Sequence, residues 1–502
     1  MQNVTFRRLC TLAALVPLPY AAQAAPSCAA IESFLAGKAT GVRCFHSDDL
    51  RTTNPSTTPP DNSITTFAHG MPLPGLTNGL ASFTPTKDRS VISNGPTATK
   101  APVPGVQVDG WVANDTTKEA RFLLRFPDDW NGKLVVAGAS GTRSEYNGDF
   151  AWSDYVLPKG YAYASQNKGV LNVYLPNEKA ADPLACRLNP SSPTWVHFYD
   201  NDPDKPFAQW TQYMLSTTVM AQGAIKATYN KSPRRTYAVG TSNGGYQVRR
   251  AVEAAPDLFD GGVDWEGTYI DASHANILID LPPALKNFPA YRDSGYDPGS
   301  PAAKNIVAAG YPPDIVKRDA SGAFVDSLWL HYWAEFWEVT ACQWQKRFDP
   351  TYATYVTGLE NYDYHSRLAV AGVFDAVNAA ATTGKITKPL ITVAGTMDAL
   401  LPIRHQARAY EAAVDASRKR NNDRREAPYR LYEVQNGNHI ESYIPLFPQL
   451  REIQPYAHKA FDLLVAHVED NAQLPPSQCI PKDGDISTNL PASGNCAELY
   501  VP

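Results

Sequence analysis

The sequence lacks an excess of basic residues, and this absence limits what the protein can bind. Its 45 Lys and Arg are outnumbered by 50 Asp and Glu, which gives a formal net charge of −5. Nucleic-acid binding requires clustered positive charge to neutralise phosphates, so we expect no nucleic-acid partner. Long apolar runs are also scarce, and none reaches the roughly 20 residues that a membrane-spanning helix needs. We therefore expect no membrane span.

The N-terminal residues 1–24 have the pattern of a secretory signal peptide. Arg7 and Arg8 precede an apolar run at residues 9–18, and a small-residue site ends at Ala24. Such segments direct export and are then removed. The sequence predicts a secreted or periplasmic protein, cleaved near Ala24.

Cysteine is scarce, with 7 in the chain, and no pair has the CxxC spacing of a metal site. Six remain after the signal peptide, an even number that favours disulfides in an exported protein. Sequence alone does not choose among the fifteen connectivities. The shortest loops to close are those of two pairs, which would leave a third pair by elimination: Cys28 with Cys44, Cys479 with Cys496, and Cys186 with Cys342.

Short apolar runs alternate with helical patterns from about residue 106, and this alternation is typical of a mainly parallel sheet flanked by helices. The predicted strands are 121–126, 133–137, 161–165, 235–239, 261–264, 389–394 and 429–434. The predicted helices are 207–229, 245–255 and 403–419. Residues 106–266 and 377–470 are expected to form this α/β domain.

Three segments depart from the alternation. Residues 25–105 are rich in Thr, Pro, Asn, Ser and Gly and are expected to be irregular. Residues 267–376 have no clear strand and are predicted to form a helical cap. Residues 471–502 are predicted to form a disulfide-containing extension. Trp329, Trp333, Phe336 and Trp337 follow helix-face spacing in the cap. They form either the core of the cap or an aromatic wall over a binding pocket, in which case Trp333 and Trp337 contact substrate.

The strongest motif is the pentapeptide GTSNG at residues 240–244, between a predicted strand and a predicted helix. A serine on such a turn stands clear of the sheet at the positive end of the helix, where an oxyanion is stabilised. Ser242 is therefore the candidate nucleophile. GxSxG alone is common in ordinary loops, so its weight comes from this context.

A serine nucleophile needs an imidazole base and a carboxylate that orients it, both from later strand ends. Asp398 follows the strand predicted at 389–394, and His439 follows the strand predicted at 429–434. Taken singly, Asp398 would be a helix cap and His439 a turn residue. Their order and positions after Ser242 favour a Ser-Asp-His triad.

Rival residues exist for both roles. Asp264 and Glu266, at the end of the strand predicted at 261–264, compete for the acid. His331, His405, His458 and His467 compete for the base, but none of them follows a strand as His439 does.

The oxyanion needs backbone N–H donors. The residue after the nucleophile, Asn243, is one candidate donor, and Ser140 in the small-residue loop 138–142 is the first choice for the second. Tyr146 and Glu145 follow that loop. They either line the pocket or lie in solvent.

These motifs resemble the α/β-hydrolase superfamily: the elbow 240–244, the acid loop 395–398 and the histidine loop 437–439 match it. The length and the insertion between Ser242 and Asp398 resemble, more narrowly, the secreted tannase and feruloyl esterase group. That group carries a cysteine before the serine and another after the histidine, where this chain has Thr241 and Ile440. The resemblance implies an α/β-hydrolase fold with a helical cap and the cleavage of carboxylic esters.

The expected function is a secreted serine esterase that needs no metal and no organic cofactor. Its expected substrates are aromatic or phenolic esters, or oligomers of hydroxyalkanoic acids, as small molecules or oligomers. Two alternatives stay open: a secreted serine peptidase with the same triad, and a non-catalytic binding protein that keeps the fold. The sequence carries no signal for the oligomeric state.

Overall fold

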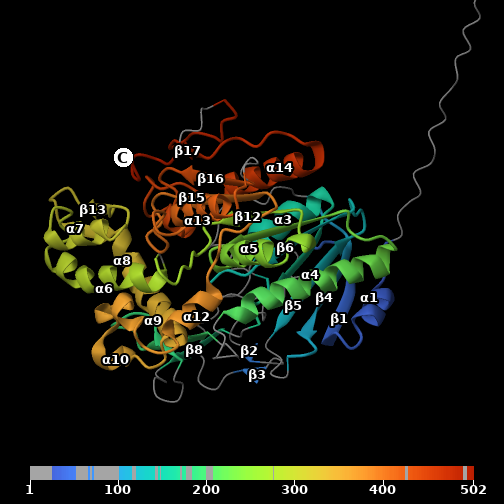
Figure 1. The fold of residues 1–502 in the computed structure, drawn as a ribbon, viewed down its shortest axis with the longest axis horizontal. Coiled ribbons are helices and arrows are strands. Elements are labelled where there is room, and N and C mark those ends of the chain that lie inside the picture. The colour runs from blue at the N-terminus through green and yellow to red at the C-terminus, as the bar shows by residue number, and fades with distance from the viewer. Residues whose placement is uncertain are drawn as a thin grey trace, which may run out of the picture.

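A ten-stranded sheet forms the centre of the protein, in the order β1-β4-β5-β7-β6-β11-β12-β15-β16-β17 (Figure 1). The computed structural model describes residues 25–51, 66–67, 71–72, 101–115, 120–141, 145–146, 148–169, 172–176, 184–198, 207–274, 276–423, 428–489 and 494–502. The predicted signal peptide, residues 1–24, lies outside these residues, as does most of 52–100. No helix of the described residues is long and apolar enough to cross a membrane.

The sheet is antiparallel from β1 to β7 and parallel from β7 to β17. Its strands are β1 Ala39–Ser47, β4 Gly105–Val112, β5 Arg121–Pro127, β6 Lys133–Gly138, β7 Ala162–Gln166, β11 Arg235–Thr241, β12 Gly261–Trp265, β15 Leu390–Gly395, β16 Tyr429–Val434 and β17 Gln478–Ile480. Every strand predicted from the sequence is present, with ends shifted by one or two residues at most.

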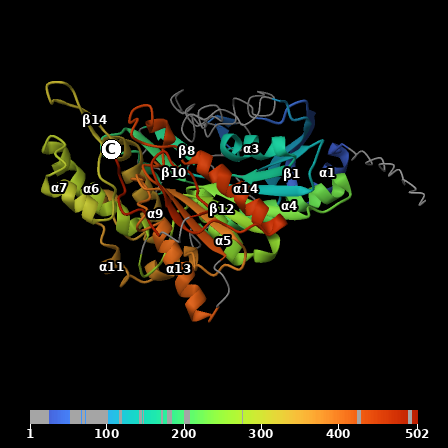
Figure 2. The same cartoon turned by 90° about the horizontal axis from the view of Figure 1, so that it is seen from above.

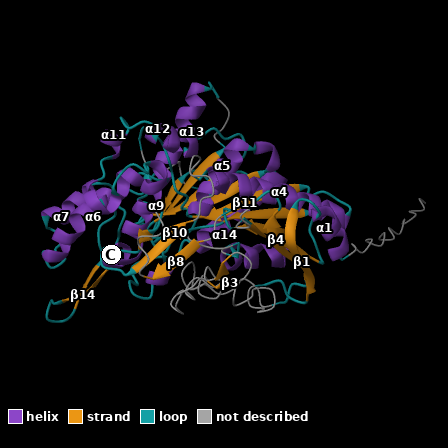
Figure 3. Ribbon diagram, turned by 90° about the horizontal axis from the view of Figure 1, so that it is seen from below, coloured by secondary structure: helices purple, strands orange, loops and turns teal. Residues whose placement is uncertain are grey.

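Helices cover both faces of the sheet, and the strand side chains alternate between the two resulting cores (Figures 2 and 3). In β6, Leu134 and Val136 belong to the core that also contains residues of α4, α5 and α13, whereas Val135 and Ala137 belong to the core that contains residues of α14. The helices of this domain are α1 Cys28–Leu35, η3 Asp149–Ser153, α3 Asp154–Val156, η4 Leu157–Lys159, α4 Ala208–Tyr229, α5 Asn243–Ala254, η5 Pro256–Leu258, α13 Ala407–Arg420, η8 Glu441–Tyr443 and α14 Gln454–Asp470. This is the predicted α/β-hydrolase fold.

The cap forms a separate layer beside one end of the sheet, at the left of Figure 1. Its elements are α6 Ile277–Asp293, α7 Pro301–Ala308, β13 Val316–Arg318, β14 Phe324–Ser327, α8 Leu328–Tyr332, the π-helix η6 Trp333–Trp337, α9 Glu338–Phe348, α10 Thr354–Thr357, η7 Leu359–Asn361, α11 Tyr364–Arg367 and α12 Val373–Ala380. The cap is therefore helical as predicted, except that β13 and β14 form a hairpin in a segment where no strand was expected.

Three disulfides hold the outlying segments: Cys28–Cys44, Cys186–Cys342 and Cys479–Cys496. They are the two pairs that loop length favoured and the third that followed by elimination, and such bonds persist in oxidising compartments. Cys186–Cys342 joins α9 of the cap to a three-stranded sheet ordered β8-β10-β9. The strands of this sheet are β8 Asn172–Pro176, β9 Cys186–Arg187 and β10 Thr194–Phe198. A separate two-stranded sheet consists of β2 Thr66–Phe67 and β3 Met71–Pro72.

The expectation of an irregular segment at residues 25–105 was wrong for its first part. Helix α1 packs on α4, and β1 forms the edge of the main sheet. Most residues of β1 are exposed or only half-buried, so the strand lacks the apolar signal that revealed the central strands. The C-terminal extension likewise contributes a strand, β17, which pairs with β16.

Candidate active site

Ser242 lies on a strained turn between β11 and α5. Its backbone has φ 57° and ψ −122°, a conformation that non-glycine residues rarely adopt and that recurs at functional sites. The amide of Ser242 donates to the carbonyl of Trp265 at 2.8 Å, which fixes the turn against the end of β12. The residue is 8% exposed. The turn has the strained geometry expected of a nucleophile elbow, and the nucleophilic role of Ser242 stays a prediction.

The glycines of the motif allow the turn to pack tightly. A Cβ on Gly240 would lie 2.3 Å from the carbonyl oxygen of Gly244, and one on Gly244 would lie 2.6 Å from that of Gly138. Any side chain at either position would force β6, β11 and the first turn of α5 apart. The GxSxG pattern is thus required by the contact between these three elements.

His439 and Asp398 form a hydrogen-bonded pair on the loops after β16 and β15. Nδ1 of His439 lies 2.8 Å from Oδ2 of Asp398, and the two side chains are 6% and 2% exposed. The other oxygen of Asp398 accepts from the amides of Leu400 and Leu401 at 2.8 and 2.7 Å. The carboxylate is therefore fixed by its own loop, and it holds Nδ1 as the protonated nitrogen of the neutral imidazole.

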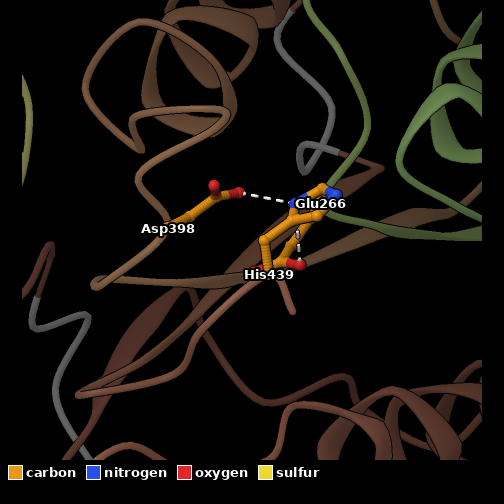
Figure 4. A group of neighbouring side chains, drawn as sticks. All are labelled: Glu266, Asp398 and His439. Carbon is orange, nitrogen blue, oxygen red and sulfur yellow. Dashed lines mark hydrogen bonds and ion pairs between the residues drawn. The ribbon is translucent and has the colours of Figure 1, made fainter. Parts of the chain in front are cut away.

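Glu266, directly after β12, contacts the same imidazole of His439. Its Oε2 is 3.3 Å from Nδ1 of His439, and Figure 4 draws this contact together with the bond to Asp398. Its Oε1 accepts from the amide of Gly395 at 3.0 Å, whereas Oε2 is buried without a hydrogen-bond partner. Burial, with the charge of Asp398, raises the pKa of Glu266 to about 8, although His439 acts to lower it. Glu266 is thus protonated at neutral pH.

The topology explains why these residues meet. Strands β11, β12, β15 and β16 are adjacent and parallel, so their carboxyl ends share one edge of the sheet. Ser242, Glu266, Asp398 and His439 each follow one of these ends. Ligands of open α/β sheets bind along this edge.

The rival acid Asp264 has a structural role. Its carboxylate is fully buried and pairs with Arg249 at 2.5 Å. It also accepts from the amide of Gly267 at 2.7 Å and from the hydroxyl of Thr392 at 2.7 Å. These bonds join α5, β12 and β15 beneath the site.

The rival bases have partners elsewhere. Nδ1 of His405 contacts Asp280 of the cap at 2.7 Å, and Nε2 of His331 contacts Asp326 at 3.0 Å. The ring of His458 stacks on Tyr155, and burial lowers the pKa of His458 to about 4. Nδ1 of His467 contacts the carbonyl of Ala472 at 2.7 Å.

The loop after β6 is held by buried polar side chains. Nζ of Lys168 donates to the carbonyls of Ala139, Ser140 and Gly141 at 3.1, 3.3 and 2.6 Å. Because these carbonyls point at the ammonium, the intervening amides are turned away from it. The amide of Ala139 donates to Gln247 at 2.9 Å and so is engaged, and the role of Ser140 as a donor to an oxyanion stays a prediction.

Asn243 is the first residue of α5, and the amides of a first helical turn have no acceptor within the helix. Its side chain accepts from the hydroxyl of Thr268 at 3.0 Å. This position suits the predicted role of Asn243 as an oxyanion donor, which stays a prediction.

The three predicted substrate-binding aromatics lie in packed surroundings. Trp337 is 0% exposed, belongs to the cap core and donates its indole N–H to the carbonyl of Ala399 at 2.6 Å. Trp333 is half-buried and stacks on Phe288. Tyr146 is 3% exposed and packs beneath the sheet, so the expectation of a solvated loop residue was wrong for it. Trp337 and Tyr146 thus act as core residues here.

Glu266, Asp398 and His439 each offer an atom within 4.8 Å of the others, a spacing that could hold a metal ion. A cation there would compete for Nδ1 of His439, the nitrogen that Asp398 orients. No metal was predicted from the sequence, and the pairing of Nδ1 with two carboxyl groups accounts for the cluster without one.

Nothing in the sequence indicated the role of Lys168. It is a single lysine after a strand, and its contacts lie 27 to 29 residues away. Glu266 was considered only as half of a rival pair. Its position directly after the strand next to β11 was the available signal.

Comparison with known proteins adds an independent observation. A family model described as 3HB-oligomer hydrolase matches residues 355–493, which include Asp398 and His439 but not Ser242. The D-(-)-3-hydroxybutyrate oligomer hydrolase of Burkholderia thailandensis is 35% identical over 118 residues, 23% of this chain and 16% of that protein. The match therefore spans about a sixth of the relative's length.

Two solved structures are similar in outline. Feruloyl esterase B from Aspergillus oryzae has a TM-score of 0.47 at 12% identity, over 88% of this chain and 90% of that one. Tannin acyl hydrolase from Aspergillus niger has a TM-score of 0.41 at 12% identity, over 76% and 82% of the two chains. By its own topology the chain has the α/β-hydrolase fold, and the loops that carry Asp398 and His439 lie in a segment similar to 3-hydroxybutyrate oligomer hydrolases.

Proposed function

We propose that this protein is a serine esterase in which Ser242, His439 and Asp398 form the catalytic triad. The observation that carries the proposal is the 2.8 Å bond from Asp398 to Nδ1 of His439, at the sheet edge that also holds the strained turn of Ser242. That bond leaves Nε2 of the imidazole as the basic nitrogen. The elbow and the first turn of α5 supply the nucleophile and the positive field beside it.

The reaction proceeds by acyl transfer. Oγ of Ser242 attacks the ester carbonyl carbon while its proton passes to Nε2 of His439. Backbone amides of Asn243 and of the loop containing Ser140 stabilise the oxyanion. The C–O bond to the alcohol then breaks, and the alcohol leaves with the proton from His439. Water repeats the sequence on the acyl-enzyme and releases the acid.

The proposed substrates are oligomers of hydroxyalkanoic acids, with 3-hydroxybutyrate oligomers first. Support comes from the match of residues 355–493 to the 3HB-oligomer hydrolase family, because that segment contains two of the three triad positions. We further propose export through the N-terminal signal, which agrees with the three disulfides. Phenolic esters are the second substrate class to test.

Active-site labelling tests the mechanism. A fluorophosphonate should label the wild-type protein at Ser242 and should not label Ser242→Ala or His439→Ala. The control is Ser366→Ala, which alters a serine that bonds Asp363 on the exposed cap surface and should label normally. A folded wild-type protein that resists labelling would support the non-catalytic alternative.

A substrate panel tests the specificity. We expect hydrolysis of 3-hydroxybutyrate dimers and trimers to exceed that of methyl ferulate in kcat/KM, with no cleavage of peptide substrates. Faster cleavage of methyl ferulate would transfer the proposal to phenolic esters, and cleavage of peptides would support the peptidase alternative.

A further inference from the structure

Nδ1 of His439 has two carboxyl groups as neighbours, one more than a triad requires. Asp398 lies at 2.8 Å and Glu266 at 3.3 Å, each on the loop after a different strand. Asp398 is held by two amides of its own loop, and Glu266 by the amide of Gly395 at the end of β15. Both acids are therefore independently fixed around one imidazole.

The two acids cannot both carry a charge at low cost. Their oxygens lie within 4.8 Å of each other, and both side chains are almost completely buried. When two carboxyl groups share such a site, one retains a proton. Oε2 of Glu266 accepts no hydrogen bond, whereas Asp398 accepts three, so Glu266 holds the proton.

Other charges around Glu266 are accounted for. Asp264 on β12 is neutralised by Arg249, and Glu441 is buried after the histidine loop, where its pKa is raised well above its ordinary value by burial. Tyr332 of the cap also acts on the site, but burial raises its pKa well above 10, so it is neutral. Beside burial, which is the largest influence, Asp398 and His439 are thus the groups whose charges act most strongly on Glu266.

We propose that Glu266 is a second acid of the site: a positioning residue that is neutral while Asp398 is ionised and that accepts the hydrogen bond from Nδ1 of His439 once the charge of Asp398 is removed. This inference rests on the proposed triad. Burial still opposes ionisation of Glu266, but without the charge of Asp398 the nearest repulsion disappears and the attraction of His439 remains, so the pKa of Glu266 falls. Glu266 then becomes the carboxyl partner of the imidazole.

A double-mutant cycle tests this role. Loss of a lone triad acid lowers kcat by about 10⁴-fold. We expect Asp398→Ala to cost only about 10- to 100-fold, and Asp398→Ala combined with Glu266→Gln to approach about 10⁴-fold. If Asp398→Ala fails to fold, Asp398→Ser replaces it in the cycle, because its hydroxyl oxygen can accept from the loop amides of Leu400 and Leu401 without placing an amide donor on Nδ1 of His439.

Glu441→Gln is the matched control. Glu441 is also a fully buried glutamate with one oxygen bonded to amides and the other without a partner, but its amide donors, Ile453 and Gln454, belong to the start of α14. Adding Glu441→Gln to the Asp398 variant should not lower kcat further. Equal kcat values with and without Glu266, in a folded Asp398 variant, would overturn the proposal.

The dependence of kcat on pH distinguishes a titrating Glu266 from one that only packs, because a residue that only packs would not change the shape of the profile. Glu266→Gln should match the wild type below about pH 7, where Glu266 is neutral, and diverge from it above pH 8. Profiles that coincide up to pH 9 would also count against the inference. Fluorophosphonate labelling of the wild type separates the proposed triad from the proposed role of Glu266. If Ser242 is labelled but the substitutions of Asp398 and Glu266 show no coupling in kcat, only the role of Glu266 is refuted.

Discussion

Lys168 shows how a single buried charge can arrange a stretch of backbone. Its side chain is 0% exposed, and its ammonium contacts three successive carbonyls of the loop at residues 139–141. The ammonium also lies 5.1 Å from the ring centroid of Trp210, a favourable cation–π arrangement. The orientation of the loop at residues 139–141, which contains the proposed oxyanion donor Ser140, therefore depends on this lysine.

We expect Lys168→Met to lower kcat by about 10- to 100-fold, somewhat less than removal of an oxyanion donor itself. Methionine has a similar length but cannot donate to the three carbonyls, so the loop amides lose their fixed direction. Steady-state kinetics on a p-nitrophenyl ester measures the change, with circular dichroism to verify folding. Lys159→Met, on an exposed lysine paired with Asp462, is the control. An unchanged kcat in the folded variant would contradict the assignment.

The candidate triad could be predicted from sequence because Ser242, Asp398 and His439 each follow a short apolar strand, and parallel strand ends must share an edge. The side chains that contact those three residues could not be predicted from sequence. The contact of Glu266 with His439 depends on β12 and β16 flanking β15, an order that sequence does not display. Burial, which decides the protonation of Glu266, was likewise invisible.

At the scale of elements, the cap is hydrogen-bonded to the loops that carry Asp398 and His439. The hydroxyl of Tyr332 on α8 donates to Oδ1 of Asn438 at 2.8 Å, next to His439. Trp337 on η6 donates to the carbonyl of Ala399, next to Asp398. The cap core also includes Met397 and Ile440 from the two loops. The cap thus supports both the acid and the histidine.

Tyr332→Phe should reduce both stability and activity. The change leaves the buried oxygen of Asn438 without this donor, which costs about 1–3 kcal/mol in the free energy of unfolding. Because Asn438 adjoins His439, we expect kcat to fall several-fold. Tyr352→Phe removes a bond to Gly358 within the cap and should cost stability alone. Urea unfolding and ester kinetics together measure the pair, and equal kcat values for both variants would contradict support by the cap.

The disulfides should differ in their contribution because they close loops of different length. Cys186–Cys342 spans 156 residues and Cys28–Cys44 spans 16. The chain-entropy model assigns the longer loop about 2 kcal/mol more stabilisation. Cys186→Ala with Cys342→Ala should therefore lower the free energy of urea unfolding more than Cys28→Ala with Cys44→Ala. An equal loss would show that the cap and the small sheet are held by packing instead.

The elements that sequence revealed are those with a strong apolar signal. The central strands β11, β12 and β15 are buried along their whole length. The edge strand β1 is mostly exposed, and the three residues of β17 are too few to show a period. The hairpin of β13 and β14 is equally short and largely open to solvent.

For the whole molecule, the buried Glu266 makes stability depend on pH. Its pKa is about 8 in the folded protein and near 4.5 in an unfolded chain. The folded state holds this proton more tightly, so the contribution of Glu266 is full below about pH 4.5 and is lost as the pH rises through 8. Relative to wild type, Glu266→Gln should therefore gain stability between pH 5 and pH 9. Urea unfolding of both proteins at pH 5 and at pH 9 measures the difference in their free energies of unfolding. A difference that is the same at both pH values would contradict a buried, protonated Glu266.

The bonds from Tyr332 and Trp337 have a consequence for how this protein could acquire new substrates. A cap that rests on the loops of Asp398 and His439 cannot be remodelled as an independent module. Substitutions that reshape it for a bulkier ester would shift the imidazole as well, so selectivity and turnover would change together. Variants selected for a new ester should accumulate compensating changes beside Asn438 and Ala399.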